Sequence, residues 1–347
     1  MNINKTRIDT DHEPFIIAEM SGNHNQSLER AIEIIHSASK AGAHAIKLQT
    51  YTADTITLDV HEKEFLINDK DSLWNGQSLY NLYNDAYTPW EWHETLFKEA
   101  KKLGIMCFTS PFSESAVDFL EELNTPAYKI ASFENAHIPL IKKVVQTKKP
   151  IIISSGLATL SELAETIKII RDFGCENFAI LKCTSSYPAN PKYSNILSIP
   201  HMKKLFGCEV GLSDHTMGIG ASIAAVSHGA SIVEKHFTLK RSDGGVDSAF
   251  SLEPTELKQL VVESKRAWQS LGKIKYGPTD DDKNSLVFRR SVYISENMIK
   301  GEILTENNLR VVRPGLGLEP KYYNILIGKK INRDVKKGTP FDWTLLD

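Results

Sequence analysis

Two histidines stand where the chain could assemble a metal site, each just beyond a short apolar segment. The expected strands cover residues 209–212 and 231–233, and His215 and His236 follow them. Residues 218–229 have the length of one crossover helix, so the two strands should be parallel neighbours. Neighbouring strands lie about 4.8 Å apart, and both histidines would lie at the same end of the sheet. Two imidazoles placed in this way could bind one metal ion.

The sequence around the two histidines narrows the choice of metal. The acidic residues Asp214, Glu234 and Asp247 lie nearby in the sequence. A site with two imidazoles and open positions for water and substrate oxygens differs from a structural zinc site, which has four protein ligands. It suits Mn²⁺ or Mg²⁺ acting as a Lewis acid, with Co²⁺ as a further candidate. The alternative is that each histidine is an ordinary hydrogen-bonded core residue.

Two lysines also stand at the ends of expected buried strands. An unpaired ammonium is costly there, so Lys47 and Lys129 each need an anionic partner. Hydroxyl side chains follow other strands: Ser110, Ser132, Ser154 and Ser213. Together these groups would bind a small, doubly anionic molecule that carries a phosphate and a carboxylate. The alternative is that each lysine pairs with a carboxylate of the fold, such as Glu19 or Glu134.

The elements that would position these residues alternate along the chain. Apolar segments that favour strands cover residues 15–18, 43–48, 105–108, 127–130, 151–153, 178–181, 209–212 and 231–233. Amphipathic helical patterns separate them, and eight such repeats in about 270 residues predict a (β/α)₈ barrel. In that fold, catalytic residues lie at the C-terminal ends of the strands. The alternative is an open doubly wound sheet, which favours a glycine-rich phosphate turn after the first strand, and residues 19–23 (EMSGN) do not form one.

Composition excludes several classes of function. With 41% hydrophobic and 24% charged residues the chain is globular, and its net charge of −2 gives no sign of a nucleic acid or an anionic membrane as partner. The four cysteines are scattered, which is typical of reduced thiols. The first ten residues lack the apolar core of a signal peptide, and no apolar segment has transmembrane length. We expect a cytoplasmic protein.

The domain organisation follows from two irregular stretches. Residues 52–89 form a long, aromatic-rich insertion after the second strand, which could be a lid or substrate wall, or a peripheral hairpin or dimer contact. Residues 276–286 belong to a Gly-, Pro- and Asp-rich linker. We therefore expect a barrel domain over residues 1–275 and a small separate domain over residues 287–347.

Nine motifs along the whole chain resemble the sialic acid synthase family. They are IIAEMSGNH (16–24), IKLQTYT (46–52), TSPF (109–112), PAYKIASFE (126–134), SSG (154–156), LKCTSSYP (181–188), GLSDHT (211–216), EKHF (234–237) and VRPGLG (312–317). Members of this family condense phosphoenolpyruvate with an N-acetylated amino sugar. The resemblance implies a barrel followed by a small antifreeze-like (SAF) β-clip domain.

The resemblance also implies a role for individual residues. Those that would hold phosphoenolpyruvate are Lys47, Ser110, Lys129, Ser132, Ser154, Ser185 and Ser213, although the neuraminate branch has Asn in place of Ser185. His215 and His236 would bind the metal. The residues that would face the sugar are Glu19, Gln49, Tyr187 and Asp247. Arg313 would reach the barrel of a partner subunit, which requires a homodimer with exchanged C-terminal domains. We expect Glu134 to act as the base that activates water.

Within the family, the stretches 48–59 and 73–93 resemble the branch that makes pseudaminic acid. The acceptor would then be 2,4-diacetamido-2,4,6-trideoxy-L-altrose, attacked as its open-chain aldehyde by C3 of phosphoenolpyruvate, with C–O cleavage to release phosphate. The alternatives are synthesis of N-acetylneuraminate or legionaminate, an aldol condensation with pyruvate through a lysine Schiff base, and a carbohydrate-binding protein on an inactive barrel.

Overall fold

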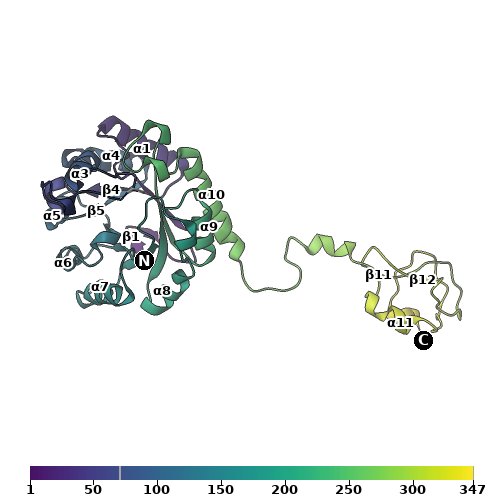
Figure 1. Cartoon of the computed structure of the whole chain (residues 1–347). Helices are drawn as coiled ribbons and strands as arrows, with labels where there is room; N and C mark the ends of the chain where they lie inside the picture. Colours follow the sequence, from purple (N-terminus) through teal and green to yellow (C-terminus); the bar gives the residue numbers. More distant parts are fainter. Residues whose placement is uncertain (70–71, 347) are drawn as a thin grey trace. The chain divides into compact units, whose positions relative to one another are not determined.

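The computed structural model describes residues 1–69 and 72–346, and eight parallel strands in that part of the chain close into a barrel (Figure 1). The strands are β3 (Phe15–Glu19), β4 (Ala45–Thr50), β5 (Met106–Pro111), β6 (Tyr128–Ile130), β7 (Ile151–Ser154), β8 (Phe178–Cys183), β9 (Glu209–Asp214) and β10 (Ile232–His236). The last strand pairs with the first, from Ile232 beside Phe15 to His236 beside Glu19. This closure confirms the barrel and excludes the open doubly wound sheet.

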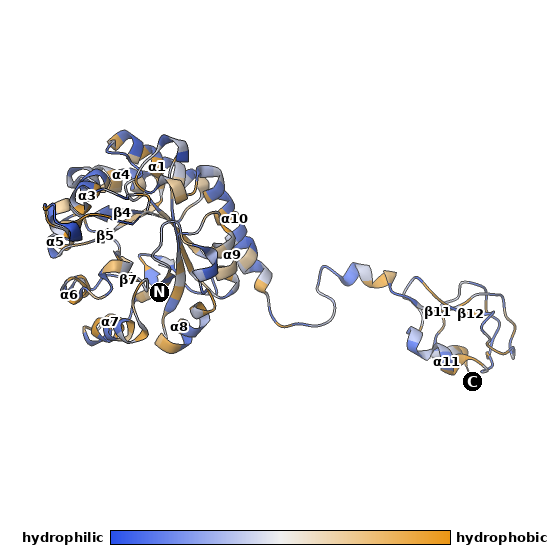
Figure 2. Cartoon of the chain, viewed as in Figure 1, coloured by the Kyte–Doolittle hydropathy of each residue, from blue (hydrophilic) through white to orange (hydrophobic). Residues whose placement is uncertain are grey.

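Helices connect successive strands and cover the outside of the barrel. They are α1 (Leu28–Ala41), α4 (His93–Leu103), α5 (Glu114–Glu122), α6 (Ile138–Gln146), α7 (Leu160–Asp172), α8 (Ser198–Phe206), α9 (Gly220–Ser227) and α10 (Pro254–Leu271). Figure 2 shows apolar and polar residues alternating along them, as expected for helices with one buried face. None of the helices in residues 1–69 and 72–346 combines the length and the apolar character needed to span a bilayer.

A short hairpin fills the end of the barrel that lies opposite the strand C-termini. It consists of β1 (Asn2–Ile3) and β2 (Thr6–Arg7). Ile3 and the nearby Ile8 are buried in the same apolar cluster as Phe15 and Ile232, at the start of the first and last barrel strands. The sequence analysis did not predict this hairpin, because two-residue strands show no alternation. Its apolar side chains close one end of the barrel, so ligands must enter from the other.

The described residues of the insertion after β4 include regular secondary structure. It contains α2 (Ala53–Ile56), a 3₁₀ turn (Lys63–Phe65) and α3 (Leu79–Ala86). Backbone hydrogen bonds join Ile67 to Gly76 and Gln77, at 2.7 and 2.9 Å. Ser78 caps α3 by accepting a hydrogen bond from the backbone N–H of Asn81. The insertion is therefore a folded segment and not an extended loop.

The chain divides into two compact units, Met1–Gly272 and Lys273–Asp347. In the second unit, β11 (Ser291–Ile294) pairs antiparallel with β12 (Leu309–Val312), and α11 (Tyr323–Leu326) follows. Its core includes Val292, Leu309 and Phe341. This unit has its own apolar core, as expected for a separately folded domain.

Candidate active site

A cavity of about 570 Å³ opens at the C-terminal ends of the barrel strands. It brings together thirteen of the fifteen residues expected from the sequence: Glu19, Lys47, Gln49, Lys129, Ser132, Glu134, Ser154, Ser185, Tyr187, Ser213, His215, His236 and Asp247. Ser110 lies outside the lining, fully buried, with its hydroxyl 3.3 Å from the ammonium of Lys47. Arg313 belongs to the C-terminal unit and is exposed.

Strand alternation explains why the polar residues converge. Residues two apart on a strand face the same side, so Glu234 and His236 of β10 both point into the barrel. Glu234 pairs in register with Ser213 of β9, and His236 pairs with Glu19 of β3. Neighbouring strands thus place a carboxylate, a hydroxyl and an imidazole side by side in the lining of the cavity.

Two lysines and two glutamates form a buried charged network at the base of the cavity. The ammonium of Lys47 lies 2.8 Å from Glu19 and 3.7 Å from Glu234. The ammonium of Lys129 lies 3.8 Å from the same oxygen of Glu234 and donates to the hydroxyl of Ser154 at 2.6 Å. The alternative expected for Lys47, pairing with Glu19, is therefore present, and both cations still face the cavity.

The two glutamates of this network differ in protonation. Burial raises the pKa of Glu19 to about 7, although Lys47 opposes the rise. Burial also acts to raise the pKa of Glu234, but Lys129 and Lys47 outweigh it, and the net pKa is lowered. Glu234 is thus ionised between the two lysines, whereas Glu19 can take up a proton near neutral pH. An anionic ligand would favour that uptake, which leaves Lys47 free to pair with the ligand.

Hydroxyl groups extend the anion-binding side of the cavity. Ser185 donates to Ser132 at 2.8 Å, and Ser213 donates to Glu234 at 3.0 Å. Gly156 allows the loop after β7 to approach them, because a Cβ atom there would lie 2.1 Å from the Cβ of Ser132. The lysines and these hydroxyls together form a site with the donors that a phosphate and a carboxylate require.

His215 and His236 lie side by side, with ring centroids 5.3 Å apart. Nδ1 of His215 is 3.0 Å from the carbonyl oxygen of Thr184 and donates to it, so Nε2 is the nitrogen that remains for a metal. Nδ1 of His236 is buried and has no hydrogen-bond partner among the described residues, and Asp247 is 3.6 Å away. Burial, followed by the charge of His215, lowers the pKa of His236 well below its usual value, so this imidazole is neutral.

These observations fit a divalent metal ion. A neutral imidazole with an unpartnered buried nitrogen and a second imidazole oriented by a carbonyl are the donors that such an ion uses. Within residues 1–69 and 72–346, no group of three or more His, Cys, Asp or Glu side chains is arranged to hold a metal. His215 and His236 would therefore hold the ion together with oxygen ligands from water or substrate.

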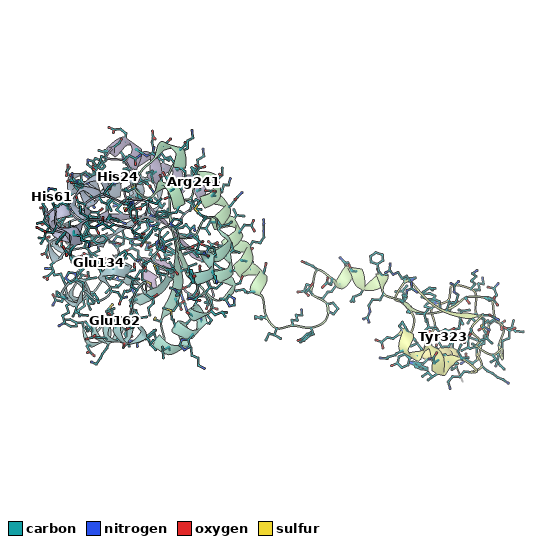
Figure 3. The ribbon with its side chains drawn as sticks, viewed as in Figure 1. His24, His61, Glu134, Glu162, Arg241 and Tyr323 are labelled. Carbon is teal, nitrogen blue, oxygen red and sulfur yellow. The ribbon has the colours of Figure 1, made fainter. Side chains whose placement is uncertain are left out.

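Glu134 is the carboxylate best placed to act as a base. It ends the 3₁₀ turn Ser132–Glu134 after β6 and lines the cavity (labelled in Figure 3). Burial raises its pKa to about 7, against the attraction of Lys129. Its Oε2 is buried and has no hydrogen-bond partner among the described residues. A carboxyl group with a pKa near neutrality and a free oxygen can exchange a proton with a bound water.

The remaining expected residues lie near the histidines and Glu19. The ring centroids of Tyr187 and His215 lie 4.5 Å apart. Asp247 accepts a hydrogen bond from Ser21, and Gln49 donates to Glu19 at 2.8 Å. These groups present both apolar and polar surface next to the histidines, as a sugar would require.

The sequence analysis missed several residues of the cavity. Glu234 was noted near the histidines but was not proposed as a site residue, although its spacing from His236 already placed both on one face of the strand. Cys183 lines the cavity, with its sulfur 3.9 Å from Nδ1 of His215. Trp74 also lines the cavity; it belongs to the aromatic-rich insertion for which a lid or substrate wall was one of the expected alternatives, although it was not proposed as a site residue.

A second ion pair supports the two histidines from outside the barrel lumen. Asp214 and Lys235 are register partners that immediately precede them, and their charged atoms lie 3.0 Å apart. Asp214 also accepts hydrogen bonds from the Thr216 backbone at 2.8 Å and the Ser222 hydroxyl at 2.6 Å. Lys235 also donates to the carbonyl of Thr216. This pair fixes the turn between β9 and the following helix.

Asp214→Asn should lower the free energy of unfolding by about 3–5 kcal/mol, because it leaves the buried ammonium of Lys235 without its charged partner. Lys235→Met should cost less, because Thr216 and Ser222 still donate to Asp214. Urea denaturation measures both. The matched control is Lys203→Met, which breaks the partly exposed pair with Glu209 and should cost about 0–1 kcal/mol. Equal losses at the two pairs would contradict the prediction.

Comparison with known proteins agrees with this geometry. The pattern of the NeuB family matches residues 34–276, and that of the SAF domain matches residues 289–347. The chain is 44% identical over 329 residues to a pseudaminic acid synthase of Campylobacter jejuni, covering 95% of each chain. It is also 44% identical to a pseudaminic acid synthase of Helicobacter pylori, covering 94% of this chain and 96% of that one.

A solved structure of a sialic acid synthetase is also similar to this chain. The N-acetylneuraminic acid synthetase of Leptospira borgpetersenii is similar with a TM-score of 0.73 and 30% identity, covering 82% of this chain and 94% of that one. The family resemblance expected from the nine motifs is confirmed. The barrel, the cavity at its strand ends and the small C-terminal domain thus have a common explanation: the chain belongs to the NeuB family and ends in a SAF domain.

Proposed function

We propose that the chain condenses phosphoenolpyruvate with 2,4-diacetamido-2,4,6-trideoxy-L-altrose and water to give pseudaminic acid and phosphate. The observation that carries the proposal is the cavity, in which two buried lysines and several hydroxyls stand beside paired imidazoles on a chain 44% identical to two pseudaminic acid synthases. The four cysteines are free thiols, which supports a reaction in the reducing cytoplasm.

Phosphoenolpyruvate would occupy the side of the cavity that contains the two lysines. Lys47 and Lys129 pair with its phosphate and carboxylate, and Ser154 and Ser213 donate further hydrogen bonds. Ser132 and Ser185, whose hydroxyls are hydrogen-bonded to each other, would bind the same phosphate. Ser110 acts through Lys47, because its hydroxyl is buried behind the ammonium. These groups hold the enol and accommodate charge on the leaving phosphate.

The sugar aldehyde would lie beside His215 and His236, within reach of Gln49, Tyr187 and Asp247. A divalent metal held by the two imidazoles would supply Lewis-acid polarisation of the aldehyde oxygen. A carbon–carbon bond forms between C3 of phosphoenolpyruvate and the aldehyde carbon, and the aldehyde oxygen takes up a proton. Glu19 can donate that proton to the aldehyde oxygen, because burial raises the pKa of Glu19 to about 7.

The second half of the reaction needs a base. Condensation leaves an electron-deficient C2, and a water molecule adds there after losing a proton to Glu134. The resulting tetrahedral carbon bears a hydroxyl and the phosphate ester oxygen. The bond from C2 to that ester oxygen breaks with its electron pair leaving on the phosphate, the hydroxyl proton passes to the departing phosphate, and the hydroxyl oxygen becomes the new carbonyl. The ester oxygen therefore departs with the phosphate.

We propose that two copies exchange their C-terminal domains, so that Arg313 reaches the partner's cavity. Residues 273–347 contain 14 Lys and Arg against 10 Asp and Glu, whereas residues 1–272 contain 27 against 33, so the two units have opposite net charge. Exposed apolar side chains stand on the loops after four successive barrel strands: Phe133, Leu157, Tyr193, Leu197 and Met217. Opposite charge and an apolar rim support docking of a partner's domain over the cavity.

The proposed reaction predicts phosphate release that depends on the correct sugar. Phosphate should be released from phosphoenolpyruvate with the altrose derivative, and at least about tenfold less efficiently, as kcat/KM, with N-acetylmannosamine. With ¹⁸O at the enol oxygen of phosphoenolpyruvate, mass spectrometry should find the label in phosphate. Release with N-acetylmannosamine alone would refute the choice of sugar, and label retained in the product would refute C–O cleavage.

A further inference from the structure

The insertion contributes a mostly apolar wall to the cavity. Its aliphatic and aromatic lining residues are Ile56, Ile67, Trp74, Leu79, Leu82, Tyr83 and Ala86. Asp69 and Ser72 are polar residues of the same segment that also line the cavity. The rest of the lining contains the charged and hydroxyl groups at the strand ends, together with a few apolar residues such as Phe112 and Val246. The cavity is therefore divided into a polar half from the barrel and an apolar half from the insertion, which we call the insertion wall.

Trp74 places the insertion wall next to the paired histidines. Its indole N–H donates to the carbonyl of Val246 at 3.0 Å. Its ring centroid lies 6.1 Å from that of Tyr187, which in turn lies 4.5 Å from the ring of His215. Because the indole N–H is already used, Trp74 can offer a ligand only its apolar ring. A sugar bound at the histidines would meet this ring.

The insertion wall is held in place by hydrogen bonds at several points. Leu66 forms a bridge with Ser78, and Gln26 donates to the carbonyl of Tyr87 at 2.8 Å. Just after the insertion, the indole N–H of Trp90 donates to the carbonyl of Tyr51 at 3.1 Å. These contacts join the insertion to the barrel, so its aliphatic and aromatic side chains border a ligand that fills the cavity.

We propose that the insertion wall selects the acceptor by its substituent at carbon 6, accepting a methyl group and disfavouring a hydroxyl group. This inference rests on the proposed function, because the proposed acceptor carries a methyl group at that carbon. A hydroxyl group buried against Ile67 and Leu79 would lose hydrogen bonds to water, and neither of these two side chains can replace them. Apolar pockets discriminate against an added hydroxyl by up to about 100-fold.

The test compares the altrose derivative with its 6-hydroxy counterpart, which differs from it by one oxygen atom. The readout is kcat/KM for phosphate release with each sugar. The wild-type chain should prefer the 6-deoxy sugar by about 10- to 100-fold. In the double variant Ile67→Thr and Leu79→Thr the new hydroxyls can pair with the sugar, and the preference should fall by at least about fivefold.

Leu73→Thr is the matched control. Leu73 belongs to the same segment, is 49% exposed and lies outside the cavity lining, so this variant should retain the wild-type preference. An unchanged preference in the double variant, with activity on the 6-deoxy sugar retained, would overturn the role of the insertion wall and leave the proposed function intact. A wild-type chain inactive with the 6-deoxy sugar but active with N-acetylmannosamine would overturn the proposed function itself. Circular dichroism of each variant confirms that the chain is folded.

Discussion

His236→Ala should reduce turnover by at least about 1000-fold and abolish its dependence on added metal. The imidazole of His236 is neutral, buried and unpartnered at Nδ1 among the described residues, which is the condition of a ligand. Removing it leaves His215 alone, and a single imidazole holds Mn²⁺ weakly. Titration calorimetry with Mn²⁺ should show the loss of binding directly, independently of any activity measurement.

The matched control is His228→Ala. His228 is an exposed histidine just beyond α9, outside the cavity, so its removal should change neither Mn²⁺ binding nor turnover. Wild-type activity that persists in chelator-treated buffer would refute the metal role of the two histidines. Retention of Mn²⁺ affinity in His236→Ala would show that the ion binds elsewhere.

Those parts of the site that lie at the C-terminal ends of the barrel strands could be predicted from the sequence. Each strand end was visible as an apolar segment followed by polar residues, and closure of the barrel then brings Glu19, Lys47 and His236 together without further information. The lysine partners were harder to predict. Lys47 contacts both Glu19 and Glu234, which come from opposite ends of the barrel unit's sequence. The sequence alone could not decide between ion pairing and anion binding, because the geometry allows both.

The sequence could not predict contacts that depend on long loops. The indole N–H of Trp74 donates to the carbonyl of Val246, which lies 172 residues further along the chain, and no periodicity in either segment indicates that contact. Ser110 was expected to touch the ligand because it follows a strand; in the structure it lies outside the cavity lining and accepts a hydrogen bond from Lys47 at 3.3 Å. In both cases the outcome depends on how neighbouring side chains pack, which residue type and spacing do not determine.

Glu134→Gln should lower kcat by about 100- to 10,000-fold, the usual contribution of a general base. The amide has nearly the same shape as the carboxyl group, so KM for phosphoenolpyruvate should stay within a few-fold of wild type. Glu165→Gln, at an exposed carboxylate on α7, should leave kcat unchanged. A Glu134→Gln chain with near-normal kcat would refute the role of Glu134 as base.

The pH dependence separates this role from a merely structural one. Burial raises the pKa of Glu134 from 4.5 to about 7, so the basic form is lost as pH falls through 7, and wild-type kcat should fall with it.

The effect of pH on stability has the opposite sign. A carboxyl group with a raised pKa favours the folded state below pH 4.5, and this contribution is lost as pH rises to about 7. Because glutamine does not titrate, the variant should lose both dependences: its residual kcat should vary less below pH 7, and its free energy of unfolding should decline less between pH 4.5 and 7. A group that only supported the fold would change the second dependence and leave the first.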